Sequence, residues 1–383
     1  MRLPLSVLEI SAMRCRLLYL VGQLRPGGLE RQLYWLLVGM NRQRYRPAVV
    51  VWNFCETDSY VPQIQALGIP LHALPNTASG PMKLRALCRL VQQLAPEVVH
   101  SYSFYTNFAA WWTTRGIQTI AIGAVRSDFT WAKKTTGPLL GRLSARWPRS
   151  QIFNSFVAAK DAQCAVSPFV PKHLFVVRNG LDMQQCQMVP VSTVGQASIL
   201  GVGSLSSIKR WDRLLGAVLA LKRRGCEFMV QIAGDGPLRR VLEQQTQDLG
   251  LATCVTFLGH RDDILQLLSK VTFLVHTSDS EGCPNVVMEA MACGRAVVAT
   301  DVGDIPALVE DGKTGFVVPR ENQALLVTRI ATLVADRDLC RRMGEAGRAK
   351  AEWEFGLDRL VSETLAVYKA AGWRSELCQN VGQ

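Results

Sequence analysis

KVTFLVHTSDSEGCPNVVMEAMACGRAVVAT, residues 270–300, places an apolar segment, a polar loop and a carboxylate-bearing helical segment directly after one another. Residues 271–276 are mostly β-branched or aromatic, which predicts a short buried strand. Glycine and proline interrupt residues 279–284 and indicate a loop. Apolar residues then recur at helical spacing over 285–294, and 296–299 predict another buried strand. Together these segments predict a βαβ unit.

Two carboxylates in this stretch are candidates for ligand binding. Ligands of βαβ units lie beyond the carboxyl ends of the strands, where loop amides and a helix N-terminus favour a diphosphate. Glu281 lies in the predicted loop and Glu289 in the second helical turn, so we expect both to face that crevice, Glu289 half exposed. We interpret them as acceptors of sugar and ribose hydroxyls rather than an acid/base pair. The alternative is a loop carboxylate and a surface ion-pair partner.

Three motifs carry a resemblance to a known family. They are E-G-C-P-N-V-V-M-E-A-M-A-C-G from Glu281, A-V-V-A-T-D-V-G-D-I-P from Ala296, and D-G-K-T-G-F-V-V-P from Asp311. This pattern resembles the E-x7-E signature of retaining GT-B glycosyltransferases of family 4. The resemblance implies an α/β fold with two Rossmann-like doubly wound parallel-sheet domains facing a central cleft. It also implies donor contacts from Glu281, Gly282, Cys283, Pro284, Asn285, Val286 and Glu289.

The implied organisation fits the length and composition of the chain. A chain of 383 residues with 48% hydrophobic residues can form two cored domains. We expect residues 1–189 to form the acceptor-binding domain and 190–360 the donor-binding domain, while 361–383 form a helix returning to the first domain and a tail. Glu9 interrupts the apolar run of Met1–Met13, which predicts a short N-terminal extension rather than a signal peptide.

Charge and cysteine content narrow the partners and the compartment. The net charge of +12 favours nucleic acid, an anionic membrane or phosphorylated substrates. No nucleic-acid-binding module is recognisable, so we expect no nucleic-acid partner. Eleven cysteines without metal spacing indicate a reducing compartment, hence the cytoplasm. No apolar run reaches the roughly 20 residues of a membrane span.

Strands and helices alternate along the first half, which predicts a doubly wound parallel sheet. The loop G-Q-L-R-P-G-G, residues 22–28, connects the first predicted strand to a helix. Gly27 and Gly28 let backbone amides approach a ligand closely. The resemblance implies that this loop reaches the donor diphosphate, so both glycines are candidate donor-binding residues.

Candidate acceptor-side residues follow the next predicted strands. His100 ends the strand in E-V-V-H-S-Y and is a candidate catalytic residue, although a lone histidine is usually structural. Family members often have V-H-x-H here, and Tyr102 occupies the place of the second histidine. Asn107 and Arg126 complete the acceptor-side set, and Arg126 is placed to meet an anionic acceptor.

Residues 131–149, WAKKTTGPLLGRLSARWPR, combine basic with apolar side chains at helical spacing. This pattern predicts a basic amphipathic helix, as used for peripheral contact with an anionic membrane. A solvated helix packed on its own domain is the equally plausible alternative.

The loop G-S-L-S-S-I-K-R-W, residues 203–211, opens the second predicted domain. Family members usually place an arginine and a lysine here on the donor diphosphate. Lys209 matches the lysine, whereas Ser204 occupies the arginine position. Lys209, helped by Arg210 or Arg25, would then neutralise the leaving group. Arg261 follows a later strand, where such proteins meet the base.

No D-x-D motif is present; the nearest approximation is Asp279-Ser280-Glu281. We therefore expect metal-independent transfer without a cofactor, with His100, Lys209 and Glu281 as catalytic residues. The resemblance implies hexosyl or N-acetylhexosaminyl transfer with retention, from a nucleotide-sugar (UDP-sugar favoured) to a glycan or lipid-linked acceptor. Cell-surface polysaccharide or glycolipid synthesis on the inner face of the cell membrane is the expected setting. The alternatives are a nucleotide-sugar epimerase of the same fold and a binding-only relative with an inactive site.

Overall fold

The computed structural model describes residues 15–192 and 195–374, and these form two compact units. Unit 1 combines the chain up to Gly180 with the segment from Leu357 onward, and unit 2 comprises Leu181–Gly356. The sequence had placed these divisions at 189/190 and 360/361. The predicted N-terminal extension, Met1–Met13, lies outside the described residues.

The described part of unit 1 contains a seven-stranded parallel sheet in the order β3-β2-β1-β4-β5-β6-β7. Its strands are β1 (Leu17–Val21), β2 (Pro47–Val51), β3 (Leu71–Ala73), β4 (Val98–Ser101), β5 (Ile120–Val125), β6 (Ser150–Phe153) and β7 (His173–Val176). Its helices are α2 (Gly28–Gly39), α3 (Arg42–Tyr45), α4 (Tyr60–Ala66), α5 (Gly80–Leu94), η1 (Phe104–Thr106), α6 (Asn107–Thr114), α7 (Phe129–Thr135), α8 (Pro138–Arg146), α9 (Phe156–Cys164) and α17 (Leu357–Ala370).

Side chains alternate between the two faces of this sheet, which gives unit 1 two cores. Tyr19 and Val49 point to the face that packs with α2, α4 and α17. Leu18 and Val50 point to the opposite face, where α5 and α6 pack. The chain order reverses between β1 and β4, with Tyr19 opposite His100, so that point is the topological switch at which ligands of such sheets bind.

Unit 2 contains a six-stranded parallel sheet in its described residues, in the order β10-β9-β8-β11-β12-β13. The strands are β8 (Ala197–Val202), β9 (Phe228–Ala233), β10 (Val255–Gly259), β11 (Phe273–His276), β12 (Ala296–Thr300) and β13 (Gly315–Val318). The helices are η2 (Ser207–Lys209), α10 (Trp211–Arg223), α11 (Arg239–Asp248), α12 (Ile264–Lys270), α13 (Asn285–Ala292), α14 (Ile305–Leu308), α15 (Gln323–Ala335) and α16 (Arg337–Glu354).

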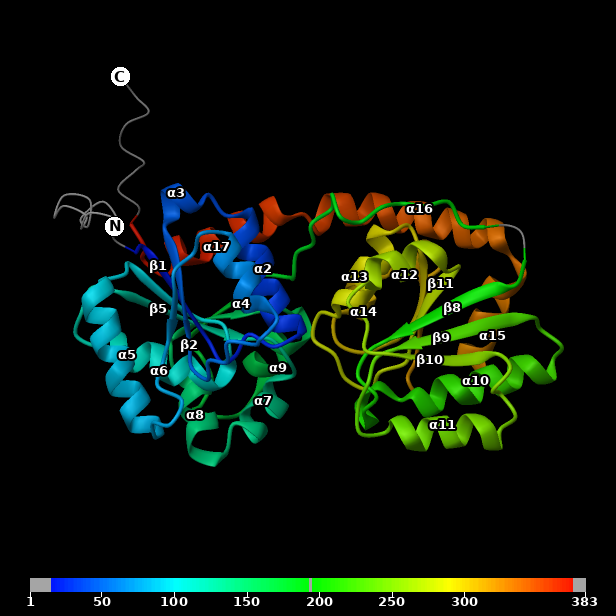
Figure 1. Cartoon of the computed structure of the whole chain (residues 1–383), viewed down its shortest axis with the longest axis horizontal. Coiled ribbons are helices and arrows are strands. Elements are labelled where there is room, and N and C mark those ends of the chain that lie inside the picture. Colours follow the sequence, from blue (N-terminus) through cyan, green and yellow to red (C-terminus); the bar gives the residue numbers. More distant parts are fainter. Residues whose placement is uncertain (1–14, 193–194, 375–383) are drawn as a thin grey trace, which may run out of the picture. The chain divides into compact units, whose positions relative to one another are not determined.

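Helices cover both faces of the second sheet. Figure 1 shows α10 and α11 on one side of its strands and α12 and α13 on the other. The predicted βαβ unit of residues 270–300 is therefore confirmed as β11, α13 and β12. Its switch point lies between β8 and β11, which pair with Leu200 opposite Leu274. The loops that follow these two strands meet at one edge of the sheet.

The predicted single helix over residues 131–149 is wrong. Two helices, α7 and α8, replace it, because Gly137 adopts a φ of +93° and Pro138 begins the second helix. A left-handed glycine and a proline in the next position interrupt the helical hydrogen-bond ladder. Trp131, Leu139 and Leu140 remain exposed, at 54%, 71% and 40% of their surface.

Candidate functional site

The loop between β11 and α13 is fixed to its own unit by backbone contacts. The amide of Asp279 donates to the Ile208 carbonyl at 2.8 Å, and Thr300 Oγ1 donates to the Ser278 carbonyl at 2.7 Å. Gly303, at φ +52°, lies so close that an added Cβ would stand 2.3 Å from the Glu281 carbonyl oxygen. The loop is thus held in one conformation before any ligand binds.

Glu281 is the centre of this loop. One carboxylate oxygen, Oε1, accepts hydrogen bonds from Lys209 Nζ at 2.5 Å, His276 Nε2 at 3.0 Å and Ser278 Oγ at 2.6 Å. Burial alone would raise the pKa of Glu281, but His276 and Lys209 overcome it and lower this pKa below the usual range. The carboxylate is therefore ionised at neutral pH and is paired with a cation inside its own unit.

Lys209 reaches Glu281 from the loop that follows β8. Thr277 Oγ1 donates to the carbonyls of Lys209 and Arg210, at 3.0 and 3.1 Å, and so joins the two loops. The lysine chain runs across Gly203, whose φ is +153° and where an added Cβ would stand 3.2 Å from Lys209 Cε. The predicted proximity of Lys209 to the Glu281 loop follows from these contacts.

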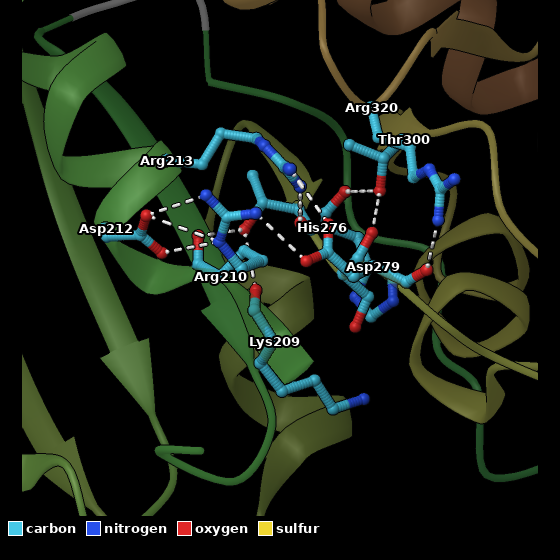
Figure 2. A network of polar contacts seen from close by, with 10 residues as sticks. Lys209, Arg210, Asp212, Arg213, His276, Asp279, Thr300 and Arg320 are labelled. Carbon is cyan, nitrogen blue, oxygen red and sulfur yellow. Dashed lines mark hydrogen bonds and ion pairs between the residues drawn. The ribbon is translucent and has the colours of Figure 1, made fainter. Parts of the chain in front are cut away.

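Arg210, the next residue, takes part in a network of ion pairs. Its guanidinium pairs with Asp212 and Asp279, both at 2.9 Å, and Arg213 binds the other oxygen of Asp279 at 2.8 Å (Figure 2). The hydrogen bonds that Arg210 donates to Asp212 and Asp279 raise the pKa of Arg210 above its ordinary value. Arg210 is thus engaged by two carboxylates, as Lys209 is engaged by Glu281, and its contact with the donor stays a prediction.

Arg320 also contributes to this network, since its Nη1 donates to the Asp279 carbonyl at 3.3 Å, as Figure 2 shows. Sequence reasoning missed His276, Arg213 and the structural role of Asp279. A signal for His276 was available, because it ends a buried strand in the same way as His100.

Glu289 lies in α13 and is 3% exposed, so the expected half-exposed position is wrong. Its neighbours Val287, Met288, Ala290 and Met291 are also buried, because both sides of this helix pack inside unit 2. Substitution of Glu289 will therefore perturb packing as well as any contact with a ligand.

The remaining predicted donor residues lie around the start of α13 and at the ends of two other strands. Pro284 precedes the helix, which begins with Asn285 and Val286. Asn285 and Val286 are partly exposed. Gly282 accepts a hydrogen bond from the Asp304 amide at 3.0 Å, and Cys283 is buried. The start of α13 therefore presents backbone, rather than long side chains.

Ser204 and Arg261 are both exposed side chains on loops of unit 2. Ser204 Oγ lies 3.0 Å from Ser206 Oγ, and its carbonyl accepts a hydrogen bond from Trp211 Nε1. Arg261 is engaged by Asp263 through two hydrogen bonds. An arginine side chain at position 204 would begin in solvent, so the position tolerates the residue that family members usually have.

Gly27 and Gly28 begin α2 in unit 1, beside the carboxyl group of Glu30. An added Cβ on Gly27 would stand 2.2 Å from Glu30 Oε2, so a larger residue there would displace the Glu30 carboxyl group. Glu30 is 8% exposed, and burial raises its pKa to about 7. Arg25 lies 3.6 Å from Asp58 within the same unit.

The acceptor-side residues differ in accessibility. Asn107 is fully buried; its Nδ2 donates to the Ala124 carbonyl at 3.1 Å and its Oδ1 accepts from the Ala124 amide at 3.0 Å. Its amide is used by the interior of unit 1, so the acceptor-side assignment of Asn107 is wrong. Tyr102 is also fully buried and donates to the Gln32 carbonyl at 3.3 Å. His100 is 1% exposed, and its Nδ1 lies 2.7 Å from the Tyr368 hydroxyl.

Residues 15–192 and 195–374 contain neither a metal-ligating cluster nor a membrane-spanning helix. No group of three or more His, Cys, Asp or Glu side chains in that part of the chain is arranged to hold a metal ion. None of its helices combines the length and apolarity that crossing a bilayer requires.

Two Rossmann-like parallel-sheet units define the GT-B class of glycosyltransferase folds, and the second unit contains the paired glutamates of the E-x7-E pattern. The second unit belongs to the glycosyl transferases group 1 family. The sequence model of that family matches residues 190–350, and a glycosyl transferase 4-like domain matches residues 27–191. Together the two matches extend across both units.

Relatives of known name agree with this membership. The chain is 26% identical to N-acetyl-alpha-D-glucosaminyl L-malate synthase of Bacillus anthracis over 55% of this chain and 54% of that protein, so the match spans about half of that relative. It is 27% identical to alpha-maltose-1-phosphate synthase of Mycolicibacterium smegmatis over 72% and 79% of the two chains.

Solved structures support the fold. The Anabaena protein Alr3699/HepE, crystallised with UDP and glucose, superposes with a TM-score of 0.79 at 22% identity, covering 93% of this chain and 100% of that one. Sucrose-phosphate synthase from Thermosynechococcus elongatus superposes with a TM-score of 0.77 at 17% identity, covering 93% of this chain and 98% of that one.

Proposed function

We propose that this protein is a retaining glycosyltransferase that moves a hexosyl or N-acetylhexosaminyl group from a nucleotide-sugar to a glycan or lipid-linked acceptor. The observation that carries the proposal is the cluster of Lys209 and His276 on the ionised Glu281 carboxylate, at the edge of the sheet where α13 begins. A cation and a helix N-terminus favour a diphosphate, and a carboxylate accepts hydrogen bonds from sugar hydroxyls.

The cluster supports a division of roles. Lys209 supplies positive charge for the departing diphosphate, and the N-terminus of α13 adds its dipole and backbone amides. Glu281 accepts hydroxyls of the donor sugar, while Glu289 accepts the ribose diol. His100 in unit 1 is proposed to contact the sugar during transfer. Reaction on one face of the sugar, without a covalent enzyme intermediate, then retains the anomeric configuration.

A UDP-sugar is the favoured donor. The Anabaena Alr3699/HepE protein has been crystallised with UDP and with UDP-glucose, and it shares the fold of this chain. Synthesis of a cell-surface polysaccharide or glycolipid is the proposed setting, on the cytoplasmic face of the membrane. Every described cysteine is a free thiol, which supports a reducing compartment.

Catalysis is proposed to be independent of metal, because Lys209 and the start of α13 supply the charge that a divalent ion provides elsewhere. Transfer should therefore persist in saturating EDTA. Complete loss of activity in EDTA, with recovery on addition of manganese or magnesium, would contradict this proposal.

Product analysis tests the reaction class. UDP-, GDP- and ADP-sugars are first screened for thermal stabilisation, because a ligand of the native state raises stability by mass action. The best donor is then incubated with an acceptor panel, and the products are analysed by mass spectrometry and by NMR of the anomeric proton. Sugar isomerisation without transfer would indicate an epimerase, and binding without turnover an inactive relative. An inverted product would contradict retention.

A further inference from the structure

Arg126 in unit 1 is a cation without a counterion among the described residues. It follows β5, and its guanidinium carbon lies 4.2 Å above the centre of the Tyr102 ring. Its Nε and Nη1 atoms are buried and have no hydrogen-bond partner, and no described carboxylate forms an ion pair with it. Burial of these two donors is costly, because their N–H groups lose water without gaining an acceptor. A bound oxyanion would supply a missing acceptor, since a guanidinium donates charge-assisted hydrogen bonds to carboxylate and phosphate oxygens.

His100 is the second unsatisfied group beside the Tyr102 ring. The two rings are 5.1 Å apart, and His100 Nε2 is buried without a partner. The hydrogen bonds of its other ring nitrogen, Nδ1, determine its tautomer. The Tyr368 hydroxyl donates to the Tyr19 hydroxyl at 3.3 Å, so it accepts the proton of His100 Nδ1 at 2.7 Å. Burial and then Arg126 lower the pKa of His100, so the ring is neutral and Nε2 carries a lone pair. This atom needs a donor such as a hydroxyl group.

Asn154 provides a third unsatisfied atom on the neighbouring strand end. Its amide nitrogen Nδ2 lies 3.5 Å from the Arg126 carbonyl, whereas its Oδ1 is buried without a partner. The backbone amide of Asn154 also donates to the Val125 carbonyl at 3.2 Å, which places the residue next to the end of β5. Two acceptors and one cation with unused donors therefore lie at the carboxyl ends of β4, β5 and β6, where ligands of parallel sheets bind.

We propose that unit 1 contains a binding site for a hydroxylated oxyanion, in which Arg126 binds a phosphate or carboxylate and His100 Nε2 and Asn154 Oδ1 accept hydroxyls of the same molecule. On the proposed function, which this inference rests on, the molecule is the acceptor, or the part of the acceptor that carries the anionic group. A neutral glycan would leave Arg126 without an acceptor for its charge.

The test measures binding of four probes to the full chain by calorimetry: inorganic phosphate, malonate, L-malate and succinate. Phosphate and malonate distinguish the two oxyanions, and L-malate differs from succinate by one hydroxyl. Wild type should bind at least one oxyanion and prefer L-malate over succinate. Arg126→Gln should weaken binding tenfold or more, whereas Arg126→Lys, which keeps the charge and loses the fork, should give an intermediate loss. Arg149→Gln is the matched control, because Arg149 is an exposed arginine of the same unit.

Equal binding by wild type and Arg126→Gln, an equal loss in Arg149→Gln, or no binding of any probe would overturn the site. If Arg126→Gln does not fold, as judged by its thermal transition, Arg126→Lys decides by the same criterion. UDP binding is measured in parallel and should be unchanged in Arg126→Gln. Failure of wild type to bind any nucleotide or nucleotide-sugar would reject the proposed transferase and leave the oxyanion result standing. UDP binding without oxyanion binding would reject the site alone.

Discussion

Replacing Lys209 with alanine should remove the cation from a carboxylate that cannot easily return to water. The Lys209 and Glu281 side chains are 20% and 14% exposed, and their charged atoms are 2.5 Å apart. Removing one partner of a buried pair costs about 3–5 kcal/mol. His276 and Ser278 still donate to the same oxygen, so we expect a loss in the free energy of unfolding of about 2–3 kcal/mol at pH 7.

The same substitution should change the pH dependence of stability. The lowered pKa of Glu281 contributes stability that is present above its unfolded value, near 4.5, and is lost as pH falls through the folded pKa. Without Lys209 the folded pKa rises toward the unfolded value, so this contribution shrinks at neutral pH. The difference between wild type and Lys209→Ala should therefore be largest at pH 7 and should diminish as the medium becomes acidic.

Hydrogen exchange of peptides covering residues 271–300 measures this loss within unit 2. Lys313→Ala is the control, because it removes the same charge from a pair with Glu310 that is 69% and 41% exposed. Such a surface pair is worth about 0–1 kcal/mol. If Lys209→Ala destabilises the unit no more than Lys313→Ala, the reasoning about a buried, dependent carboxylate is refuted.

Turnover by Lys209→Ala tests the catalytic part of the same reasoning. Negative charge on the leaving group grows in the transition state, so the loss of Lys209 should lower kcat more than it lowers the affinity for the donor. Removal of one such donor typically costs about a hundredfold to a thousandfold in rate, or roughly 3–4 kcal/mol. Ser204→Arg should restore part of the lost rate in the Lys209→Ala background. A kcat near that of wild type would show that this loop does not contact the diphosphate.

Three further predictions address other parts of the chain. Because burial raises the pKa of Glu30, its protonated side chain contributes stability that is fully present below about pH 4.5 and is lost as pH rises through about 7. Glu30→Gln should remove this change, about 3 kcal/mol in the free energy of unfolding, from denaturant titrations repeated across that pH range. An unaltered pH profile would contradict this prediction. Gly303→Ala should weaken UDP-sugar binding tenfold or more, because the added Cβ displaces the Glu281 loop. Gly312→Ala is the control, since Gly312 also has a positive φ but has open space around it, and binding should not weaken. Equal affinities of the two variants for the UDP-sugar, measured by calorimetry, would exclude a steric cause. The exposed apolar side chains of α7 and α8 are the predicted membrane contact. A variant with serine in place of Trp131, Leu139 and Leu140 should no longer sediment with anionic vesicles, while its thermal midpoint should change little. Undiminished sedimentation would exclude these side chains as the membrane contact.

The strand, loop and helix of residues 270–300 could be predicted because each depends on local properties. A buried parallel strand requires a run of apolar side chains, a loop requires residues that break periodicity, and α13 repeats its apolar residues at helical spacing. Gly137 and Pro138 were equally visible in the sequence, and the mistaken single helix came from giving amphipathic spacing more weight than these two breakers.

The partners of individual side chains could not be obtained in this way. Arg210 and Lys209 are neighbours with the same charge, yet Arg210 binds two carboxylates of its own loop network and Lys209 binds Glu281. Asn107 is polar in the sequence but is satisfied by the backbone of β5. Apart from the pair of Arg210 with Asp212, these contacts join segments distant in the chain, and no local rule gives the distance between them.

The amino-acid sequence by itself determined the alternation of strands and helices and the order of the glutamates, glycines and lysine in the second half. It did so because hydrophobic period and backbone preference act over a few residues. Only the tertiary structure decided that Glu289 is buried, that His276 and Lys209 share one oxygen of Glu281, and that Arg126 has no counterion among the described residues. Burial and electrostatic pairing depend on which strand ends lie side by side, and that arrangement is a property of the folded sheets.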